Sequence, residues 1–190
     1  PYFEVKFKDL AGHIFGRITP EGDVIPWRFD SKAVAQQDLL QYHESAVTNE
    51  RHQTRTQAPG KLLDLAGLAA ILAPRGFSAK EVLSTYQKMY EAQVVSYPRT
   101  EDKTVTPEQF NELLPKIDQI AQVVHVDTAL LTHRQPRATH VKNQGAHGAN
   151  RPGENVPTDL ATLTKFGASA QAIYEVLAKN YLAMLAEDYV

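Results

Sequence analysis

The chain has 190 residues, no cysteine, and 20 Lys and Arg side chains against 22 Asp and Glu, which gives a formal net charge of −2. The absence of cysteine excludes a disulfide scaffold, a thiolate metal site and a cysteine nucleophile. The longest apolar run, 62–73, is interrupted by Asp64 and is shorter than the roughly 18 residues of a membrane span, so we expect no membrane partner. A net charge that is slightly negative does not suggest nucleic acid as the first partner to consider.

The first part of the chain is typical of short strands and one helix. Phe3, Val5 and Phe7 alternate with charged residues, which is the period of a half-buried strand. Turn-forming and β-branched residues then predict further elements. These are a strand at 13–19, a turn at 19–23, a strand at 24–29, a helix capped by Ser31 that runs to about residue 45, and an extended segment at 46–57.

After residue 58 the pattern becomes helical. Capping-box spacing, in which Ser or Thr is followed three residues later by Glu or Gln, predicts helix starts at Ser78 and Thr106. The run 62–73 is apolar nearly all round, which predicts a buried helix. Segment 134–157 is rich in Gly and Pro and predicts a long loop, a kind of loop that is usually functional or disordered. Further helices are expected at 118–126, at 159–166 and after Gly167, the last with Ile173, Leu177, Tyr181 and Leu185 on one face.

These elements predict an α+β fold, in which an N-terminal antiparallel β segment is followed by a mostly α-helical domain. The charge within it is segregated, because residues 128–153 contain no Asp or Glu, and neither do residues 51–63. Local charge is what attracts phosphates, so a basic groove is one interpretation. The alternative is a solvated loop with incidental charges. The cations of the longer stretch are Arg134, Arg137, Lys142 and Arg151.

The residues that remain as nucleophiles are hydroxyls, lysines and carboxylates. No Gly-x-Ser-x-Gly elbow and no phosphate-binding Gly-rich loop is present. His133, His140 and His147 recur at intervals of seven, which does not match a compact metal pair, and we expect no metal site in this chain. Four tyrosines have helical spacing and are more typical of a core than of catalysis. They are Tyr86, Tyr90, Tyr174 and Tyr181.

Tyr97 stands apart, because Pro98 follows it and disfavours helical geometry for the residue before a proline. In an extended chain, residues i and i+2 point to the same side, so Tyr97 and Arg99 are expected to project together. A nearby guanidinium favours the phenolate and also grips a phosphate through two N–H donors. The pair therefore suits attack on a phosphodiester. A plain turn without a catalytic role is the alternative.

Four ordered stretches carry a resemblance to one family. Segment 96–101 (SYPRTE) closely resembles the active-site tyrosine motif of type IA DNA topoisomerases, and its proline is more similar to the topoisomerase III branch. Segment 146–152 (AHGANRP) resembles the second motif, Ala-His-Glu-Ala-Ile-Arg-Pro, with Gly148 and Asn150 as departures. Segment 58–65 is similar to a degenerate form of the family's Pro-rich entry into its helical domain, and segment 76–80 is similar to the usual run before the next helix. Glu101 stands where the family usually has Asp.

The resemblance implies a domain layout. Residues 1–57 would form part of the β-rich arch segment, residues 58–186 the mostly helical domain with the active-site tyrosine, and residues 187–190 the return to the arch. The chain begins at Pro1 rather than Met, and we expect it to be a central piece of a longer protein. In the family an acidic toprim domain precedes this region and holds Mg²⁺. The resemblance therefore implies no cofactor in this piece, and Mg²⁺ in the full-length enzyme through the toprim domain.

The resemblance also implies roles by position. Tyr97 would attack one DNA strand and hold its 5′ phosphate. Arg99 would bind the scissile phosphate, and His147 would assist by hydrogen bonding or proton relay. Arg151 would contact the strand or fix its loop, with a salt bridge to Glu101 or Glu154 as the alternative. The weaker DNA-contact candidates are Lys142, His140 and Thr100.

The implied activity is an ATP-independent cycle in which one strand is cut, another is passed and the first is resealed. The implied substrate is single-stranded DNA in negatively supercoiled molecules. The implied location is the bacterial cytoplasm, at the nucleoid or a plasmid. We expect this piece alone not to cleave DNA well. A DNA-binding or partner-binding module that kept the fold without the activity is the alternative.

Two other tyrosine enzymes fit the sequence less well. A tyrosine recombinase places its His-x-x-Arg box before a C-terminal tyrosine, whereas His147 and Arg151 are further apart and follow Tyr97. A conjugative relaxase needs a His-hydrophobe-His metal pair, which the sequence lacks.

Overall fold

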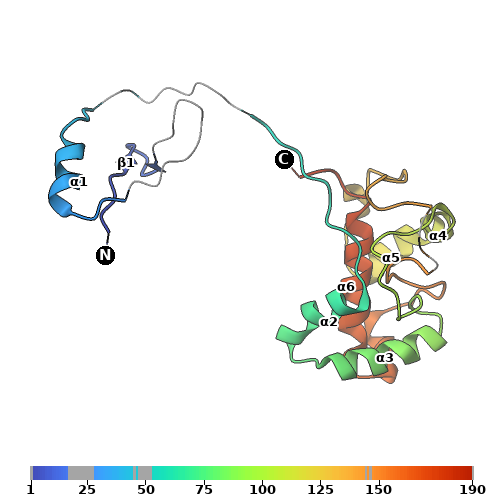
Figure 1. Cartoon of the computed structure of the whole chain (residues 1–190). Helices are drawn as coiled ribbons and strands as arrows, with labels where there is room; N and C mark the ends of the chain where they lie inside the picture. The colour runs from blue at the N-terminus through green and yellow to red at the C-terminus, as the bar shows by residue number, and fades with distance from the viewer. Residues whose placement is uncertain are drawn as a thin grey trace. The chain divides into compact units, whose positions relative to one another are not determined.

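The chain forms two compact units, Pro1–Gln53 and Thr54–Val190 (Figure 1). The computed structural model describes residues 2–16, 28–44, 46, 53–143, 145 and 147–189. The division between the units falls close to the boundary expected at residue 57, and the second unit also includes the end of the chain. Each unit has its own set of buried apolar residues. The architecture is α+β, as the sequence predicts.

The first unit contains a small antiparallel hairpin and one helix. Strand β1 (Phe7–Lys8) pairs with β2 (Ile14–Phe15), so that Phe7 lies opposite Phe15. An isolated antiparallel bridge joins Phe3 to Phe29. The alternation predicted around residue 5 is confirmed in part, because Val5 is buried, Phe7 is half-buried and Phe3 is exposed.

Helix α1 (Lys32–Leu39) is shorter than predicted. Ser31 occupies the N-cap position in extended geometry, although its side chain makes no capping hydrogen bond. The helix stops at Leu39 because only Ala35 is buried, and a short helix without a packed face is marginal. The predicted turn at 19–23 and most of the strand at 24–29 lie outside the described residues, as does Ser45.

The second unit is helical (Figure 1). Helices α2, α3 and α5 all pack on α6, which has the predicted apolar face buried along its length. The predicted strand at 46–57 is not formed by its described residues, where Gln57 makes only an isolated bridge to Tyr189. The segment predicted as a helix at 159–166 is a 3₁₀ helix. The α-helices are α2 (Leu65–Leu72), α3 (Ala79–Glu91), α4 (Pro107–Leu113), α5 (Ile117–Val123) and α6 (Ala170–Ala183), and the 3₁₀ helices are η1 (Ala73–Arg75), η2 (Leu114–Lys116), η3 (Thr128–Leu130) and η4 (Leu160–Phe166).

Side-chain caps fix where three of these helices begin. Asp64 accepts from the N–H of Gly67 at 2.7 Å and starts α2. Ser78 accepts from the N–H of Glu81 at 3.2 Å and starts α3, as predicted. At α4 the capping box is complete, because Thr106 and Gln109 each accept a backbone N–H of the other. Such caps satisfy helix N–H groups that have no partner within the helix.

The prediction that the apolar run 62–73 is fully buried is wrong for one face of α2. Leu68 and Leu72 are buried against the core, but Ile71 is 42% exposed and Ala66 and Ala70 are also exposed. The helix has a packed side and an open side, although its sequence is apolar on both. Ala66 on the open side also lines a pocket between α2 and α3.

Three tyrosines, Tyr86, Tyr174 and Tyr181, are fully buried in the core, where burial raises their pKa. The core prediction is confirmed for these three. The hydroxyl of Tyr174 is buried without a hydrogen-bond partner among the described residues. A buried hydroxyl without a partner costs free energy in the folded state.

Tyr174→Phe is therefore expected to raise the free energy of unfolding by about 0.5–1 kcal/mol. Removing the oxygen leaves the ring in place, so neither a cavity nor an unpaired group is created. Urea denaturation followed by circular dichroism measures the change. Tyr174→Ala is the contrasting variant and should lower the free energy of unfolding by about 3–5 kcal/mol. A destabilised Phe variant would mean that the hydroxyl is bound after all.

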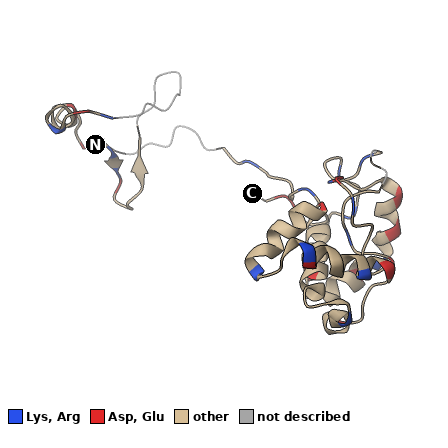
Figure 2. Ribbon diagram, turned by 60° about the horizontal axis from the view of Figure 1, so that its bottom comes forward, with Lys and Arg blue, Asp and Glu red and all other residues tan. Residues whose placement is uncertain are grey.

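Among the described residues of the basic stretch 128–153, two of the four cations are paired with acidic residues elsewhere in the second unit. Arg134 pairs with Asp118 at 2.5 Å, and Arg137 pairs with Asp188 and also donates to the carbonyls of Met184 and Ala186. These two arginines thus join the loop to acidic residues elsewhere in the second unit. In Figure 2 the basic and acidic residues of that unit are interspersed. Of the four cations, Lys142 and Arg151 form no ion pair with a described residue.

Within the described ranges, no helix has both the length and the apolar character needed to cross a bilayer.

Candidate active site

The segment before Tyr97 is joined to the loop at 147–153. The N–H of Ser96 donates to the carbonyl of Arg151 at 3.0 Å, and the N–H of Arg151 donates to Oγ of Ser96 at 3.0 Å. A bridge between Val95 and Pro152 continues the pairing. The two stretches that resemble one family in sequence therefore lie side by side.

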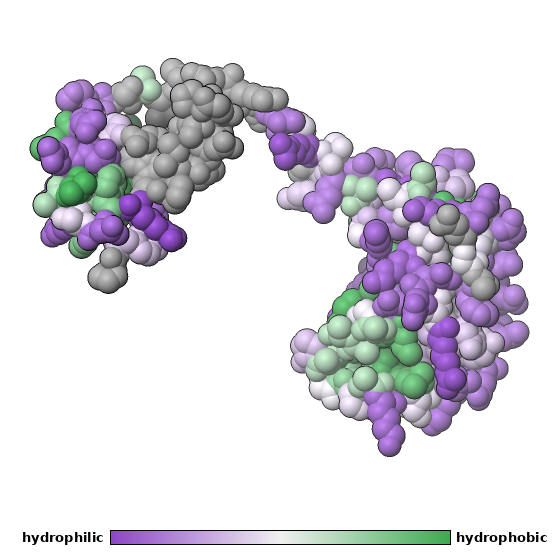
Figure 3. Space-filling view, viewed as in Figure 1, coloured by the Kyte–Doolittle hydropathy of each residue, from purple (hydrophilic) through white to green (hydrophobic). Residues whose placement is uncertain are grey.

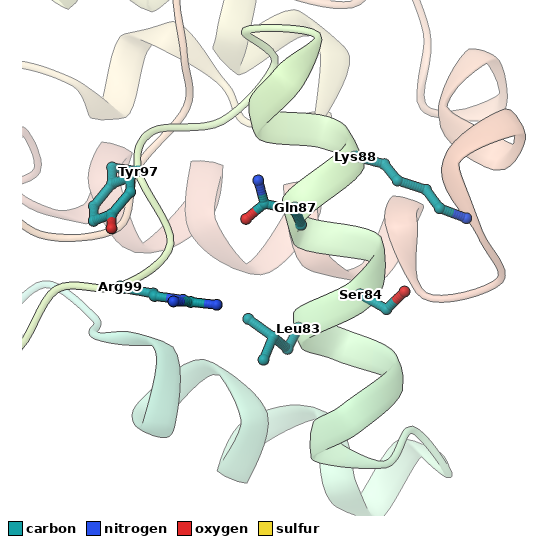
Figure 4. Close-up of a pocket in the computed structure, with 6 residues that line it drawn as sticks. All are labelled: Leu83, Ser84, Gln87, Lys88, Tyr97 and Arg99. Atoms are coloured by element: carbon teal, nitrogen blue, oxygen red, sulfur yellow. The ribbon is translucent and has the colours of Figure 1, made fainter.

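Tyr97 and Arg99 line one pocket, as the sequence predicts, although the chain bends at Pro98 and Arg99 and the N–H of Thr100 donates to the carbonyl of Pro98 at 3.2 Å. Figure 4 shows that both come from the segment after α3 and face Leu83 and Gln87 of that helix. Ser84 and Lys88 complete the lining. Pro98 itself is buried, whereas Tyr97 is half-buried and Arg99 is exposed. A tyrosine hydroxyl and a guanidinium thus face one solvent-accessible space.

The ring of Tyr97 is held between two aromatic neighbours. Its centroid lies 4.6 Å from that of His147, with a tilt of 39°, and 5.5 Å from that of Tyr90, edge to face. Such contacts restrict a ring without fixing its hydroxyl. Tyr90 is 37% exposed, so the prediction that it is a core residue is wrong. The spacing of Tyr90 from Tyr86 predicts that both lie on one buried face of the helix. The chain turns at Gln93, where φ is positive, and the ring of Tyr97 lies against that of Tyr90.

Arg151 lies beside the same tyrosine, in a pocket that also includes Tyr97, His147 and Glu112. One nitrogen of its guanidinium donates to the carbonyls of His147 and Ala149, both at 3.2 Å. Burial lowers the pKa of Arg151, and the nearby Tyr181 and Glu112 oppose that shift. The ion pair to Glu101 or Glu154 is not formed, so Arg151 fixes its loop through carbonyls.

Gly148 replaces the Glu of the family motif for a reason that is visible in the packing. The backbone φ of Gly148 is +68°, a value that residues other than glycine rarely adopt. A Cβ added at this position would lie under 3.0 Å from the side-chain amide of Gln109. Gln109 donates to the carbonyl of His147 at 3.2 Å, and Asp102 accepts from the N–H of Gly148 at 3.0 Å. Gln109 and Asp102 therefore hold the peptide between His147 and Gly148.

Gln109→Ala is expected to lower the free energy of unfolding by about 1–2 kcal/mol and to speed hydrogen exchange at the N–H of Gly148. The variant removes half of the α4 capping box and the donor to His147. Thr106→Ala is the matched control, because it removes the other half of the box without touching the His147 loop. Urea denaturation and amide exchange followed by NMR measure the two effects. Equal exchange at Gly148 in both variants would contradict the role of Gln109 in this loop.

Asn150 stands where the family motif has an aliphatic residue. Its side chain is buried, and its amide donates to the carbonyl of Pro98 at 3.5 Å. Its backbone N–H donates to Leu63 at 2.9 Å. The residue thus lies directly beneath the link between Tyr97 and Arg99, and it contributes polar contacts from inside the core.

The other predicted DNA contacts are not gathered around Tyr97. His140 is 1% exposed, with Nε2 at 2.8 Å from the carbonyl of Gly60 and Nδ1 at 2.8 Å from Oγ1 of Thr139. Both ring nitrogens of His140 have partners within the protein, so the residue has a structural role and is not available to contact DNA. Lys142 is exposed and pairs with Val105 through its backbone. Thr100 is half-buried, and its hydroxyl accepts from the N–H of Asp102 at 3.0 Å.

Sequence reasoning missed several of the residues that shape the site. The helical spacing of Tyr90 predicts a core position, and no sequence pattern singles out Asp102. The capping-box pattern predicts a role for Gln109 at the start of its helix, but it does not predict the hydrogen bond from Gln109 to the carbonyl of His147. Among the described residues, no group of three or more His, Asp or Glu side chains is placed to hold a metal ion.

Comparisons with known proteins agree on one family. The family model described as DNA topoisomerase matches residues 1–190. The chain is 32% identical over 143 residues to a DNA topoisomerase 3 of Bacillus licheniformis, covering 67% of this chain and 18% of that protein. It is 25% identical over 153 residues to a DNA topoisomerase 3 of Bacillus subtilis, covering 77% of this chain and 20% of that protein. The chain thus spans about a fifth of the length of these curated relatives.

A solved structure supports the fold. The full-length topoisomerase I of Thermotoga maritima superposes with a TM-score of 0.52 at 19% identity, over 87% of this chain and 27% of that one. Family model, relatives and fold therefore lead to the same conclusion as the tyrosine and histidine motifs: the chain belongs to the DNA topoisomerase family, in its type IA class.

Proposed function

We propose that Tyr97 is the nucleophile with which a type IA topoisomerase cuts one strand of DNA. The observation that carries the proposal is the placement of the Tyr97 hydroxyl and the Arg99 guanidinium in one open pocket, with the tyrosine ring held by Tyr90 and His147. Family membership supports the reaction class.

In the proposed step the Tyr97 oxygen attacks the phosphorus, and the bond from phosphorus to the 3′ oxygen breaks. The phenol proton leaves Tyr97, and the 3′ oxygen takes up a proton. The 5′ phosphate stays on Tyr97, so the number of phosphoester bonds is unchanged and no ATP is needed to reseal the strand. Arg99 binds the phosphate oxygens through its paired N–H donors and stabilises the charge that develops on them.

His147 and Arg151 support the step in different ways. The imidazole of His147 packs on the Tyr97 ring and restricts its orientation. The guanidinium of Arg151 donates hydrogen bonds to the carbonyls of residues 147 and 149. It is a partly buried cation that lies beside Tyr97. Both roles are positional, and Arg151 also adds positive potential near the reacting phosphate.

The proposed substrate is single-stranded DNA, exposed where negative supercoiling opens the duplex. Single-strand grooves combine cations with aromatic platforms, and the Tyr97 site offers both. The toprim domain that the family resemblance implies would hold Mg²⁺ in the full-length protein. The chain of 190 residues alone is expected to cleave poorly.

The test uses the full-length protein that carries this chain, with Mg²⁺ and a single-stranded oligonucleotide labelled at one end. Attack that leaves a 5′ phosphotyrosine keeps the 3′-terminal fragment on the protein. A 3′ label should therefore migrate with the protein after denaturation, while a 5′ label should be released. Peptide mass spectrometry should then find the nucleotide on the peptide that contains Tyr97.

Retention of the 5′ label would reverse the polarity and contradict the proposal. Nucleotide on another tyrosine would reject Tyr97 as the nucleophile. If the full-length protein bound the oligonucleotide without forming any adduct, the alternative of a non-catalytic DNA-binding module would replace the proposal.

A further inference from the structure

A second pocket adjoins the one that Tyr97 and Arg99 share. This α2–α3 pocket has a volume of about 670 Å³ and lies between helices α2 and α3 and the segment 98–101. Arg99 and Leu83 line both pockets, so the two are continuous at these residues. The volume falls within the range of small-molecule sites.

The walls of the α2–α3 pocket are largely apolar. Leu65, Ala66 and Ala69 come from α2, and Leu83 comes from α3. In Figure 3 a cluster of apolar side chains covers this part of the second unit, over α2. Small side chains on α2 leave a space that a flat group can enter, and they account for the open side of this helix.

Two cations border the same pocket. Lys80 and Arg99 both line it, and neither forms an ion pair with a described residue. Its acidic lining residue Asp64 is already engaged, because it caps α2 and lies 3.4 Å from Lys103. Glu101 is the other acidic residue of the lining. The pocket therefore combines an apolar interior with a border that carries two cations, Lys80 and Arg99, and the carboxylate of Glu101, next to the proposed site of strand cleavage.

We infer that the α2–α3 pocket binds a nucleobase of the strand whose scissile phosphate Arg99 holds. The inference rests on the proposed function of Tyr97 and Arg99. A base presents an apolar face, which the α2 side chains can cover, and its backbone phosphate is negative, which suits Lys80 and Arg99. Apolar burial is non-directional and does not depend on which base is present, so the pocket would hold the strand in place without reading its sequence.

NMR titration of the 190-residue chain, with labelled methyl and amide groups, tests the inference. One ligand is a thymidine octamer, and the other has the same backbone with every base replaced by an abasic analogue. The thymidine octamer should shift the methyl signals of Leu65, Ala66, Ala69 and Leu83. The abasic octamer should shift only the amides near Lys80 and Arg99, and its Kd should be about tenfold higher.

A pair of variants separates filling of the pocket from general effects on α2. Ala66 lines the pocket and Ala70 does not, although both are exposed on the same helix. Leucine is a good helix former, so both Leu variants should fold. Ala66→Leu should raise the Kd for the thymidine octamer about fivefold and leave that for the abasic octamer unchanged. Ala70→Leu should change neither value.

Equal Kd values for the two octamers would overturn the inference, as would an unchanged Kd in Ala66→Leu. Shifts at Tyr97 and Arg99 without methyl shifts would reject the base site and leave the proposed function standing. No shift anywhere at millimolar octamer would reject DNA binding by this face altogether. The adduct assay on the full-length protein tests cleavage separately.

Discussion

Tyr97→Phe in the full-length protein is expected to abolish the covalent adduct with single-stranded DNA, a loss of about 10³-fold or more. The variant keeps the ring that packs between Tyr90 and His147 and removes only the oxygen that would bond to phosphorus. Folding should therefore be unchanged, and the loss should be chemical. Adduct formation with the 3′-labelled oligonucleotide and relaxation of supercoiled plasmid provide the two measurements.

Tyr90→Phe is the matched control for this experiment. It removes a hydroxyl from the neighbouring ring and keeps the edge-to-face contact at 5.5 Å. Adduct formation should remain within about threefold of the wild type, because the aromatic contact does not depend on the hydroxyl. Loss of activity in Tyr90→Phe together with persistence in Tyr97→Phe would exchange the roles of the two tyrosines.

Gly153→Ala is expected to lower the free energy of unfolding by about 2–4 kcal/mol and to disturb the site with it. An added Cβ would lie under 3.0 Å from the carbonyl of Gln93 and from the backbone of Val94. Backbone atoms cannot move aside as a flexible side chain can. The N–H of Gly153 also donates to the carbonyl of Val94 at 2.8 Å, so this close approach is part of the pairing next to Tyr97.

Gly60→Ala is the control for Gly153→Ala, because no heavy atom lies within 4 Å of the position that its Cβ would take. It should leave stability within about 0.5 kcal/mol of the wild type. Urea denaturation gives both values. A Gly153→Ala protein as stable as Gly60→Ala would mean that the two backbones can separate at little cost.

Local signals in the sequence predicted local structure well. The capping residues Ser78 and Thr106 begin helices where predicted, since a cap depends on neighbours three residues away. Tyr97 and Arg99 line one pocket, as their spacing around Pro98 predicts. The family resemblance singled out His147, and the structure brings its ring against Tyr97.

What the sequence could not predict depends on contacts between distant segments. The sequence makes His140 a candidate DNA contact, but its ring reaches the carbonyl of Gly60 and is buried there. Arg137 contributed to an expected basic groove, yet its charge is matched by Asp188 near the end of the chain. Neither partner has a sequence spacing that a local pattern could reveal. The same holds for Gln109, whose amide fills the space beside Gly148.

The pairing of Ser96 with Arg151 has a consequence for the order in which the protein matures. Tyr97 leaves the ribosome well before residues 147–153, which supply His147 and the backbone partners of Ser96. Until those residues have been synthesised and have folded back, the tyrosine has no imidazole beside it and no fixed direction. A nascent chain therefore carries Tyr97 without its neighbours, and the contact between Tyr97 and His147 forms only after residues 147–153 have been synthesised.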